Sequence, residues 1–192
     1  MRVSPQKAVE NHELIIDAAS ALFREKGFDG AGVVDIMKAV QLTHGGFYAH
    51  FASKDDLVAQ ASQRAIERTA TNWTNVTTEA PKNPYAALLT HYLSPRHRDD
   101  PGHGCAFAAL SGEAARCGKP VRSVFARGLE PLIEIVAKAV PGRSKSERRR
   151  KAVAAVAELV GALMLARAVD DPALSNEILD AAQQELLAAA NR

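Results

Sequence analysis

Apolar residues in this chain recur three and four positions apart, and this spacing limits the folds that the chain can adopt. Between positions 12 and 26 they form a single stripe, made of Leu14, Ile15, Ala18, Ala19, Leu22 and Phe23. Such a stripe is typical of an amphipathic helix. Much of the 47% hydrophobic content is alanine, and alternating β-branched runs are few. Because alanine favours helices and strands need such alternation, we expect an all-α protein.

Residues that start or break helices divide the chain into elements. Ser4 and Pro5 are suited to begin the first helix, and Gly27 supplies the left-handed residue that commonly ends one. Pro131 predicts a kink, or two abutting helices, within a long apolar stripe. The expected helices cover 4–26, 33–40, 43–51, 54–78, 83–93, 105–116, 119–140, 146–169 and 172–190, with a loop over 94–104.

Composition and charge restrict the classes of protein and of partner. No stretch approaches about 18 uninterrupted apolar residues, so we expect no membrane span. The polar N-terminus has no signal-peptide core, and Cys105 and Cys117 are expected to be reduced, so we predict a cytoplasmic protein. Residues 1–60 contain six Lys and Arg against eight Asp and Glu. A nucleic-acid site in this region would therefore depend on geometry rather than on bulk positive charge.

One segment, Leu42 to Leu57, has the sequence LTHGGFYAHFASKDDL. It is unusually polar for a helix, and its two adjacent glycines have no side chains. Two glycines inside a short helix cost roughly 1 kcal/mol each relative to alanine. A helix, a short turn and a second short helix with a polar leading end are typical of a helix-turn-helix, whose second helix enters the DNA major groove. Gly45 and Gly46 would let that backbone approach DNA, while Phe47 and Phe51 are expected to pack inward. The alternative is a plain three-helix bundle with a solvated polar face.

The residues around this segment resemble a known family. The run from IIDAASALFREKGFDG through VVDIMKAVQLTHGGFYAHFASKDDLVAQA, within about residues 11–60, is similar to the DNA-binding region of the tetracycline-repressor (TetR) family of bacterial transcriptional regulators. The resemblance implies an N-terminal helix-turn-helix DNA-binding domain of three helices, 1–53, and a C-terminal helical domain for ligand binding and dimerisation, 54–192. It implies operator contacts from Thr43, His44, Gly45, Gly46, Tyr48, His50 and Lys54.

Two positions depart from the family pattern. The family usually has Thr or Ser before the second helix, where this chain has Ala31-Gly32. It usually has Gly in the turn, where this chain has Gln41. We expect Gln41 to adopt a left-handed conformation at a cost of about 1 kcal/mol. Both departures affect the phosphate contacts at that end of the site.

The penultimate helix is apolar on nearly all sides. Between Ala152 and Ala166 the only charged residue is Glu158. Such a helix must be covered on two sides. The family resemblance implies a homodimer through the last two helices, and the alternative is a central helix in a monomeric core. A two-fold dimer would present its recognition helices about one DNA turn, ~34–36 Å, apart.

The resemblance also implies a pocket for a small-molecule effector in the second domain. Trp73 is the only tryptophan and lies on the helix that would connect the pocket to the DNA-binding head. The alternative for each candidate is an ordinary core position. The candidates are Trp73, Tyr92, Cys105, Phe107, Leu110 and Phe125, with Tyr85, His91 and Cys117 as further members.

The combined prediction is a dimeric, ligand-responsive transcriptional regulator, a repressor of a near-palindromic operator that a small molecule releases. One alternative is a helical interaction adaptor without DNA binding. Another is a metal-dependent enzyme that uses the His- and Cys-containing segment 91–105. That segment matches no established metal-ligand spacing, and the sequence has no recognisable nucleophile–base pair or phosphate loop. We therefore expect no enzymatic activity, no cofactor and no metal site.

Overall fold

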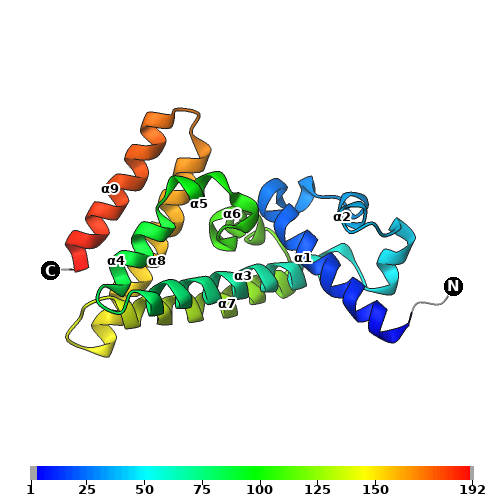
Figure 1. Cartoon of the computed structure of the whole chain (residues 1–192), viewed down its shortest axis with the longest axis horizontal. Helices are drawn as coiled ribbons and strands as arrows, with labels where there is room; N and C mark the ends of the chain where they lie inside the picture. The colour runs from blue at the N-terminus through cyan, green and yellow to red at the C-terminus, as the bar shows by residue number, and fades with distance from the viewer. Residues whose placement is uncertain (1–3, 191–192) are drawn as a thin grey trace.

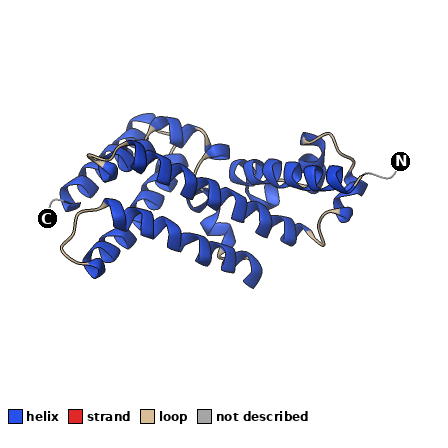
Figure 2. Ribbon diagram, turned by 60° about the horizontal axis from the view of Figure 1, so that its bottom comes forward, coloured by secondary structure: helices blue, strands red, loops and turns tan. Residues whose placement is uncertain are grey.

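A computed structural model describes residues 4–190, and this part of the chain is helical throughout, with no strand (Figure 2). The fold class is as predicted. None of the helices in these residues is long and apolar enough to cross a membrane. The elements are α1 (Pro5–Gly30), α2 (Val33–Ala39), η1 (His44–Ala49), α3 (Lys54–Glu79), α4 (Pro84–Tyr92), α5 (Pro95–Asp99), η2 (Pro101–His103), α6 (Ala106–Ala114), α7 (Lys119–Ala139), α8 (Lys145–Ala168) and α9 (Pro172–Ala190).

Several predicted helix boundaries are confirmed by the capping contacts. The hydroxyl of Ser4 accepts a hydrogen bond from the backbone N–H of Lys7 at 3.2 Å, which fixes the start of α1. The hydroxyl of Ser53 accepts from the N–H of Asp56 at 3.1 Å and starts α3 in the same way. Gly27 has a φ of 77°, so the regular part of α1 ends there, and the last residues form a short turn across a kink.

Three expectations about elements were wrong. The segment after Thr43 is a 3₁₀ helix rather than an α-helix, because its short backbone bonds span three residues, as from Gly46 N–H to Thr43 O at 3.0 Å. The Thr43 hydroxyl makes no capping bond. The expected loop contains α5 and η2, each begun by a capping side chain and a proline, at Ser94 and at Asp100.

The long helix α7 continues through Pro131 as one helix, so of the two expected arrangements, a kink or two abutting helices, the second is wrong. Pro131 lies on the exposed side of α7, so the backbone hydrogen bond that it removes is not buried in the core.

The helices build an elongated molecule with a small head at one end (Figure 1). The head consists of α1, α2 and η1. Helix α3 leaves the head and runs beside α7, and α8 and α9 lie at the opposite end. Helix α1 packs against α3, α6 and η2, so the head is continuous with the rest of the core. The positions of the functional residues in the head therefore depend on how α1 is held.

Candidate functional site

Two stacked aromatic rings fix the 3₁₀ helix η1 on the head. Phe47 and Phe51 are buried, as predicted, with ring centroids 5.4 Å apart, and Phe51 stacks on His12 of α1 at 4.6 Å. This packing directs the other side of η1 to solvent. Tyr48 is 69% exposed and His44 is exposed, with their rings 6.4 Å apart. The two residues form an outward-facing polar edge on a rigid apolar base.

The two glycines of η1 differ in their surroundings. A methyl group at Gly45 would meet no atom of the described residues within 4 Å. At Gly46 it would meet the Thr43 hydroxyl and the Met37 methyl at ordinary contact distances of 3.7 and 3.8 Å. Packing inside the protein therefore does not require a glycine at position 45. The backbone at Gly45 is therefore open to solvent on this side.

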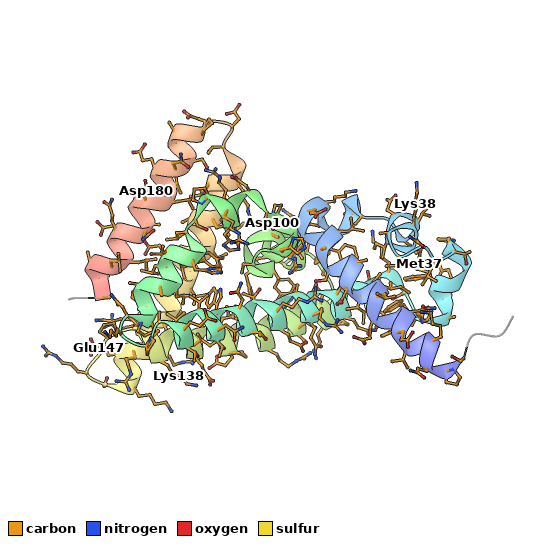
Figure 3. The ribbon with its side chains drawn as sticks, in the orientation of Figure 1. Met37, Lys38, Asp100, Lys138, Glu147 and Asp180 are labelled. Carbon is orange, nitrogen blue, oxygen red and sulfur yellow. The ribbon has the colours of Figure 1, made fainter. Side chains whose placement is uncertain are left out.

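The turn between α2 and η1 has the strained conformation that the sequence predicts. Gln41 has a φ of 58° and is the only non-glycine residue with a positive φ in residues 4–190. The N–H of Leu42 donates to the carbonyl of Met37 at 2.9 Å and closes the turn. Figure 3 shows Met37 pointing into the head and the exposed Lys38 pointing away from it. At the start of α2, Gly32 is the N-cap and offers no side-chain hydrogen bond.

The remaining predicted contacts lie on the two flanks of η1. Thr43 is exposed directly before η1. Lys54 is half-buried at the first position of α3, where free backbone N–H groups favour an anion. His50 is half-buried, and burial, with a contribution from His12, lowers its pKa. His50 is therefore mainly neutral at physiological pH, so the basic groups of this site are few, as the charge count of residues 1–60 indicates.

A pocket of about 330 Å³ lies where α3, α4 and the segment 94–105 meet the end of α1. Trp73, Tyr92 and Cys105 of the predicted effector residues line it, together with His91. The rings of Trp73 and Tyr92 meet edge to face at 5.4 Å. The structure does not bring the other five candidates to this pocket, and Tyr85 and Cys117 are among these five. Phe107, Leu110 and Phe125 are buried in the core, with Phe107 and Phe125 in edge-to-face contact at 5.3 Å.

Sequence reasoning missed the arginines of this pocket, Arg24, Arg68 and Arg96, and considered His97 only within the possible metal site of segment 91–105. Arg24 follows the buried residues Ile16 and Ser20 at helical spacing, and this register is the signal that could have identified it. The ring of His97 bonds to the Tyr92 carbonyl at 2.8 Å through Nδ1 and accepts from the Cys105 N–H at 3.0 Å through Nε2. Within residues 4–190 no three His, Cys, Asp or Glu side chains converge as a metal site would require.

Comparisons with known proteins agree with the geometry of the head. Residues 15–61 match the family model described as bacterial regulatory proteins, tetR family. Over 127 residues, 65% of this chain, the sequence is 32% identical to the A-factor receptor protein of Streptomyces griseus. Over 83 residues, 42% of this chain, it is 32% identical to the uncharacterized HTH-type transcriptional regulator YuxN of Bacillus subtilis. The matched regions span only 40% and 28% of the lengths of these two curated relatives.

Solved structures share the fold over nearly the whole chain. A TetR transcriptional regulator from Chloroflexus aurantiacus superposes with a TM-score of 0.77 at 22% identity, covering 97% of each chain. The reduced form of E. coli NemR superposes with a TM-score of 0.76 at 21% identity, covering 92% of this chain and 95% of that one. The aromatic base of η1, the matched head and the shared fold lead to one conclusion. The head of this chain, residues 15–61, belongs to the TetR family of bacterial regulatory proteins, and the chain shares the fold of solved TetR-family regulators.

Proposed function

We propose that this protein is a dimeric, ligand-responsive repressor that binds a near-palindromic operator and leaves it when a small-molecule effector binds. Residues 1–53 would form the DNA-binding head, and residues 54–192 the effector and dimerisation domain. One observation carries the proposal. The edge formed by His44, Gly45 and Tyr48 is exposed and unobstructed, while Phe47 and Phe51 hold it rigidly from below. Rigid presentation of a short polar helix end is what base recognition in the major groove requires.

The proposed DNA contacts divide by type. His44 and Tyr48 would face base edges and the adjacent backbone, and Gly45 and Gly46 would allow close approach. Thr43, His50 and Lys54 would contact phosphates on the two flanks, where such contacts position the protein without reading sequence.

Dimerisation is supported by an uncovered apolar face on the last two helices. Val153, Met164 and Leu165 of α8 and Leu174 of α9 are each between 39% and 59% exposed. Gly161 lies in the same part of α8, and a methyl group there would meet no described atom within 4 Å. An apolar face with a small residue near its middle is suited to close packing against the same face of a second copy.

The response to an effector is supported by contacts that join the pocket to the head through α1. Arg24 of α1 donates to the Gly104 carbonyl at 3.3 Å, on the pocket wall. At the end of the same helix, the Phe28 N–H donates to Glu113 of α6 at 2.6 Å. A shift of segment 94–105 or of α6 on ligand binding would therefore move α1, and with it the spacing of the two heads. Such rigid-body shifts are a common form of allosteric change.

The test is a selection of genomic DNA fragments by the purified protein, repeated with Tyr48→Ala. Tyr48 is exposed, so its truncation leaves the core of the head intact. The proposal predicts recovery of one near-palindromic sequence by the wild-type protein and its loss with the variant. The affinity for that sequence should fall steeply with salt concentration, because phosphate contacts release counterions. Failure to enrich any sequence at low salt would refute DNA binding by the ligand-free protein and favour the adaptor function.

A further inference from the structure

The pocket beside α1 carries an excess of positive charge. Arg24, Arg68 and Arg96 line it, and Asp100 is the only acidic side chain in its lining. Arg68 already pairs with Asp17 at 2.8 Å, and the Asp100 carboxylate bonds to a neighbouring histidine ring. Among the described residues, neither Arg24 nor Arg96 forms an ion pair. At least two guanidinium groups therefore face the pocket without a carboxylate partner.

Arg24 is the unusual member of this group because it is almost fully buried. It is 5% exposed, and its one hydrogen bond goes to a neutral backbone carbonyl, that of Gly104. Its Nε atom has no partner within residues 4–190. Burial, and then repulsion by Arg68, lower the pKa of Arg24 to about 10, so it stays charged at neutral pH. A buried charge without a counterion is costly and is normally compensated by a ligand or an opposite charge.

A second buried polar group of the same pocket also lacks a partner. The Tyr92 side chain is fully buried, and its hydroxyl lies beside the weakly bonding Cys105 thiol, with no nitrogen or oxygen partner within the described part of the chain. Buried hydroxyl groups are nearly always satisfied in folded proteins. The same pocket therefore contains an uncompensated cation, an unsatisfied hydroxyl and an aromatic wall formed by Trp73 and Tyr92.

We propose that the effector is a small organic anion, with a carboxylate or phosphate group bound by Arg24 and Arg96 and an apolar body against Trp73. This inference rests on the proposed effector-responsive function and specifies the ligand for it. A cavity of about 330 Å³ is at the lower end of the size range of ligand pockets, so the ligand is compact. Guanidinium groups are well suited to carboxylate and phosphate because they bond to both in a bidentate manner.

The position of Arg24 gives the anion a direct route to the DNA-binding head. Arg24 belongs to α1, the first helix of the head, whereas Arg96 belongs to α5. In Figure 3, Asp100, which lines the same pocket, lies beside the end of α1, where the two parts of the molecule meet. An anion that binds both arginines would fix α1 relative to α5. The anion would then act on the head directly through α1, without intermediate side chains.

The inference can be tested on the full chain without DNA, because Trp73 is the only tryptophan and lines the pocket. The probes are benzoate, hexanoate and phenyl phosphate, each compared with a neutral analogue of similar size: benzamide, hexanamide and phenol. We expect at least one anion to change the Trp73 fluorescence saturably, with the matched neutral compound binding at least about tenfold more weakly. Comparison of the carboxylates with phenyl phosphate identifies the preferred anionic group.

Substitutions of Arg24 and Arg96 test whether these two side chains bind the anion. Arg24→Met is expected to weaken binding of the best anion by about ten- to a hundredfold, which is the scale of lost hydrogen bonds to a charged group. Arg96→Met, at an exposed position, should weaken it by about three- to tenfold without affecting folding. Arg127→Met is the matched control on the exposed surface of α7, outside the pocket, and should leave binding unchanged.

The inference is overturned if no anion changes the fluorescence at millimolar concentration, or if the neutral compounds bind as well as the anions. It is also overturned if Arg96→Met and a folded Arg24→Met both bind the anion like the wild type. If Arg24→Met fails to fold, the inference is tested by the affinity of Arg96→Met for the anion alone, and wild-type affinity in that variant overturns it. These outcomes are independent of the operator selection, so a protein that binds operator DNA but no anion would refute this inference and leave DNA recognition standing.

Discussion

At the scale of single residues, His97 connects the proposed effector pocket to the stability of the fold. Its Nε2 accepts a hydrogen bond from Cys105, so protonation of the ring would remove that bond. Burial, reinforced by the nearby charge of Arg167, lowers the pKa of His97 from 6.5 to about 4. The unfolded chain therefore binds this proton more readily than the folded chain does. Stability from this group is fully present above pH 6.5 and is lost as the pH falls toward 4.

The resulting prediction concerns the free energy of unfolding at pH 7.5 and at pH 5, measured by chemical denaturation. For the wild type we expect a decrease toward acid pH, of which His97 contributes at most about 3 kcal/mol over the full range. His97→Gln should be less stable at pH 7.5 but should lose less on acidification. Some acid sensitivity should remain in the variant, because the pKa values of His50 and His91 are also lowered. Parallel pH profiles for the two proteins would contradict this role of His97.

Gly45 provides a second test at the residue scale, because the structure leaves open space beside it. Gly45→Leu should fold with an equal or higher free energy of unfolding, since it replaces a weak helix former. Its affinity for the operator recovered in the selection should fall at least about tenfold, the scale of one lost base contact. The measurement is fluorescence anisotropy of labelled operator DNA.

Gly112→Leu is the matched control for this substitution. Gly112 is exposed on α6 and also has open space around it, but it lies outside the head. Its replacement should leave operator affinity unchanged. Equal affinities for the Gly45 and Gly112 variants would show that the backbone at position 45 does not approach DNA.

At the scale of elements, the sequence predicted helices well where a side chain itself marks the boundary. Ser4 and Ser53 form the expected caps, and Gly27 and Gln41 adopt the expected left-handed conformations. The type of helix at η1 was not predictable, because the i→i+3 and i→i+4 patterns differ little over six residues. The short elements α5 and η2 lie in the segment expected to be a loop, although Ser94-Pro95 and Asp100-Pro101 are cap-and-proline pairs.

The turn between α2 and η1 yields a prediction about strain. Gln41 has a φ of 58°, which costs a side-chain-bearing residue about 1 kcal/mol. Gln41→Gly should relieve this strain, and the greater freedom of glycine in the unfolded chain should offset part of the gain. We expect a net increase of about 0.5 kcal/mol in the free energy of unfolding, measured by urea denaturation.

The same substitution elsewhere gives the control for this experiment. Gln184 is exposed within α9, where the backbone is helical, and Gln184→Gly should decrease stability by about 1 kcal/mol. An increase in the free energy of unfolding for Gln41→Gly together with a decrease for Gln184→Gly would identify strain at Gln41. A destabilising Gln41→Gly would mean that the Gln41 side chain makes a stabilising contact that outweighs the strain.

At the scale of the whole molecule, the sequence predicted the two sites unequally. The residues proposed to contact DNA lie within twelve positions of one another, so a local pattern contains them. The proposed effector pocket instead joins residues distant in the sequence, such as Arg24 and Gly104, which are 80 positions apart. The aromatic members Trp73 and Tyr92 were identifiable by residue type. The arginines were not, because a charged residue on a helix is ordinarily at the surface.

The proposed dimer is the property of the whole molecule on which the proposed operator recognition depends. Leu165 is 59% exposed on α8, within the apolar face proposed as the interface, so it contributes little to the core of one protomer. Leu165→Glu would place a carboxylate in the interface of each copy, and burying an unpaired charge is strongly unfavourable. We expect a folded monomer at micromolar concentration, by sedimentation and by circular dichroism. Its operator affinity should fall sharply, because one head binds only half of the site.

Leu14→Glu is the control for the dimer prediction, since Leu14 is 49% exposed on α1 at the other end of the molecule. The two variants carry the same substitution and the same change in charge at exposed leucines, so a difference in oligomeric state between them depends on position. Leu14→Glu should remain dimeric. If Leu165→Glu also remains dimeric, the exposed face of α8 is not the interface. Two heads held by a different surface would then require a different spacing of operator half-sites, which the recovered palindrome would reveal independently.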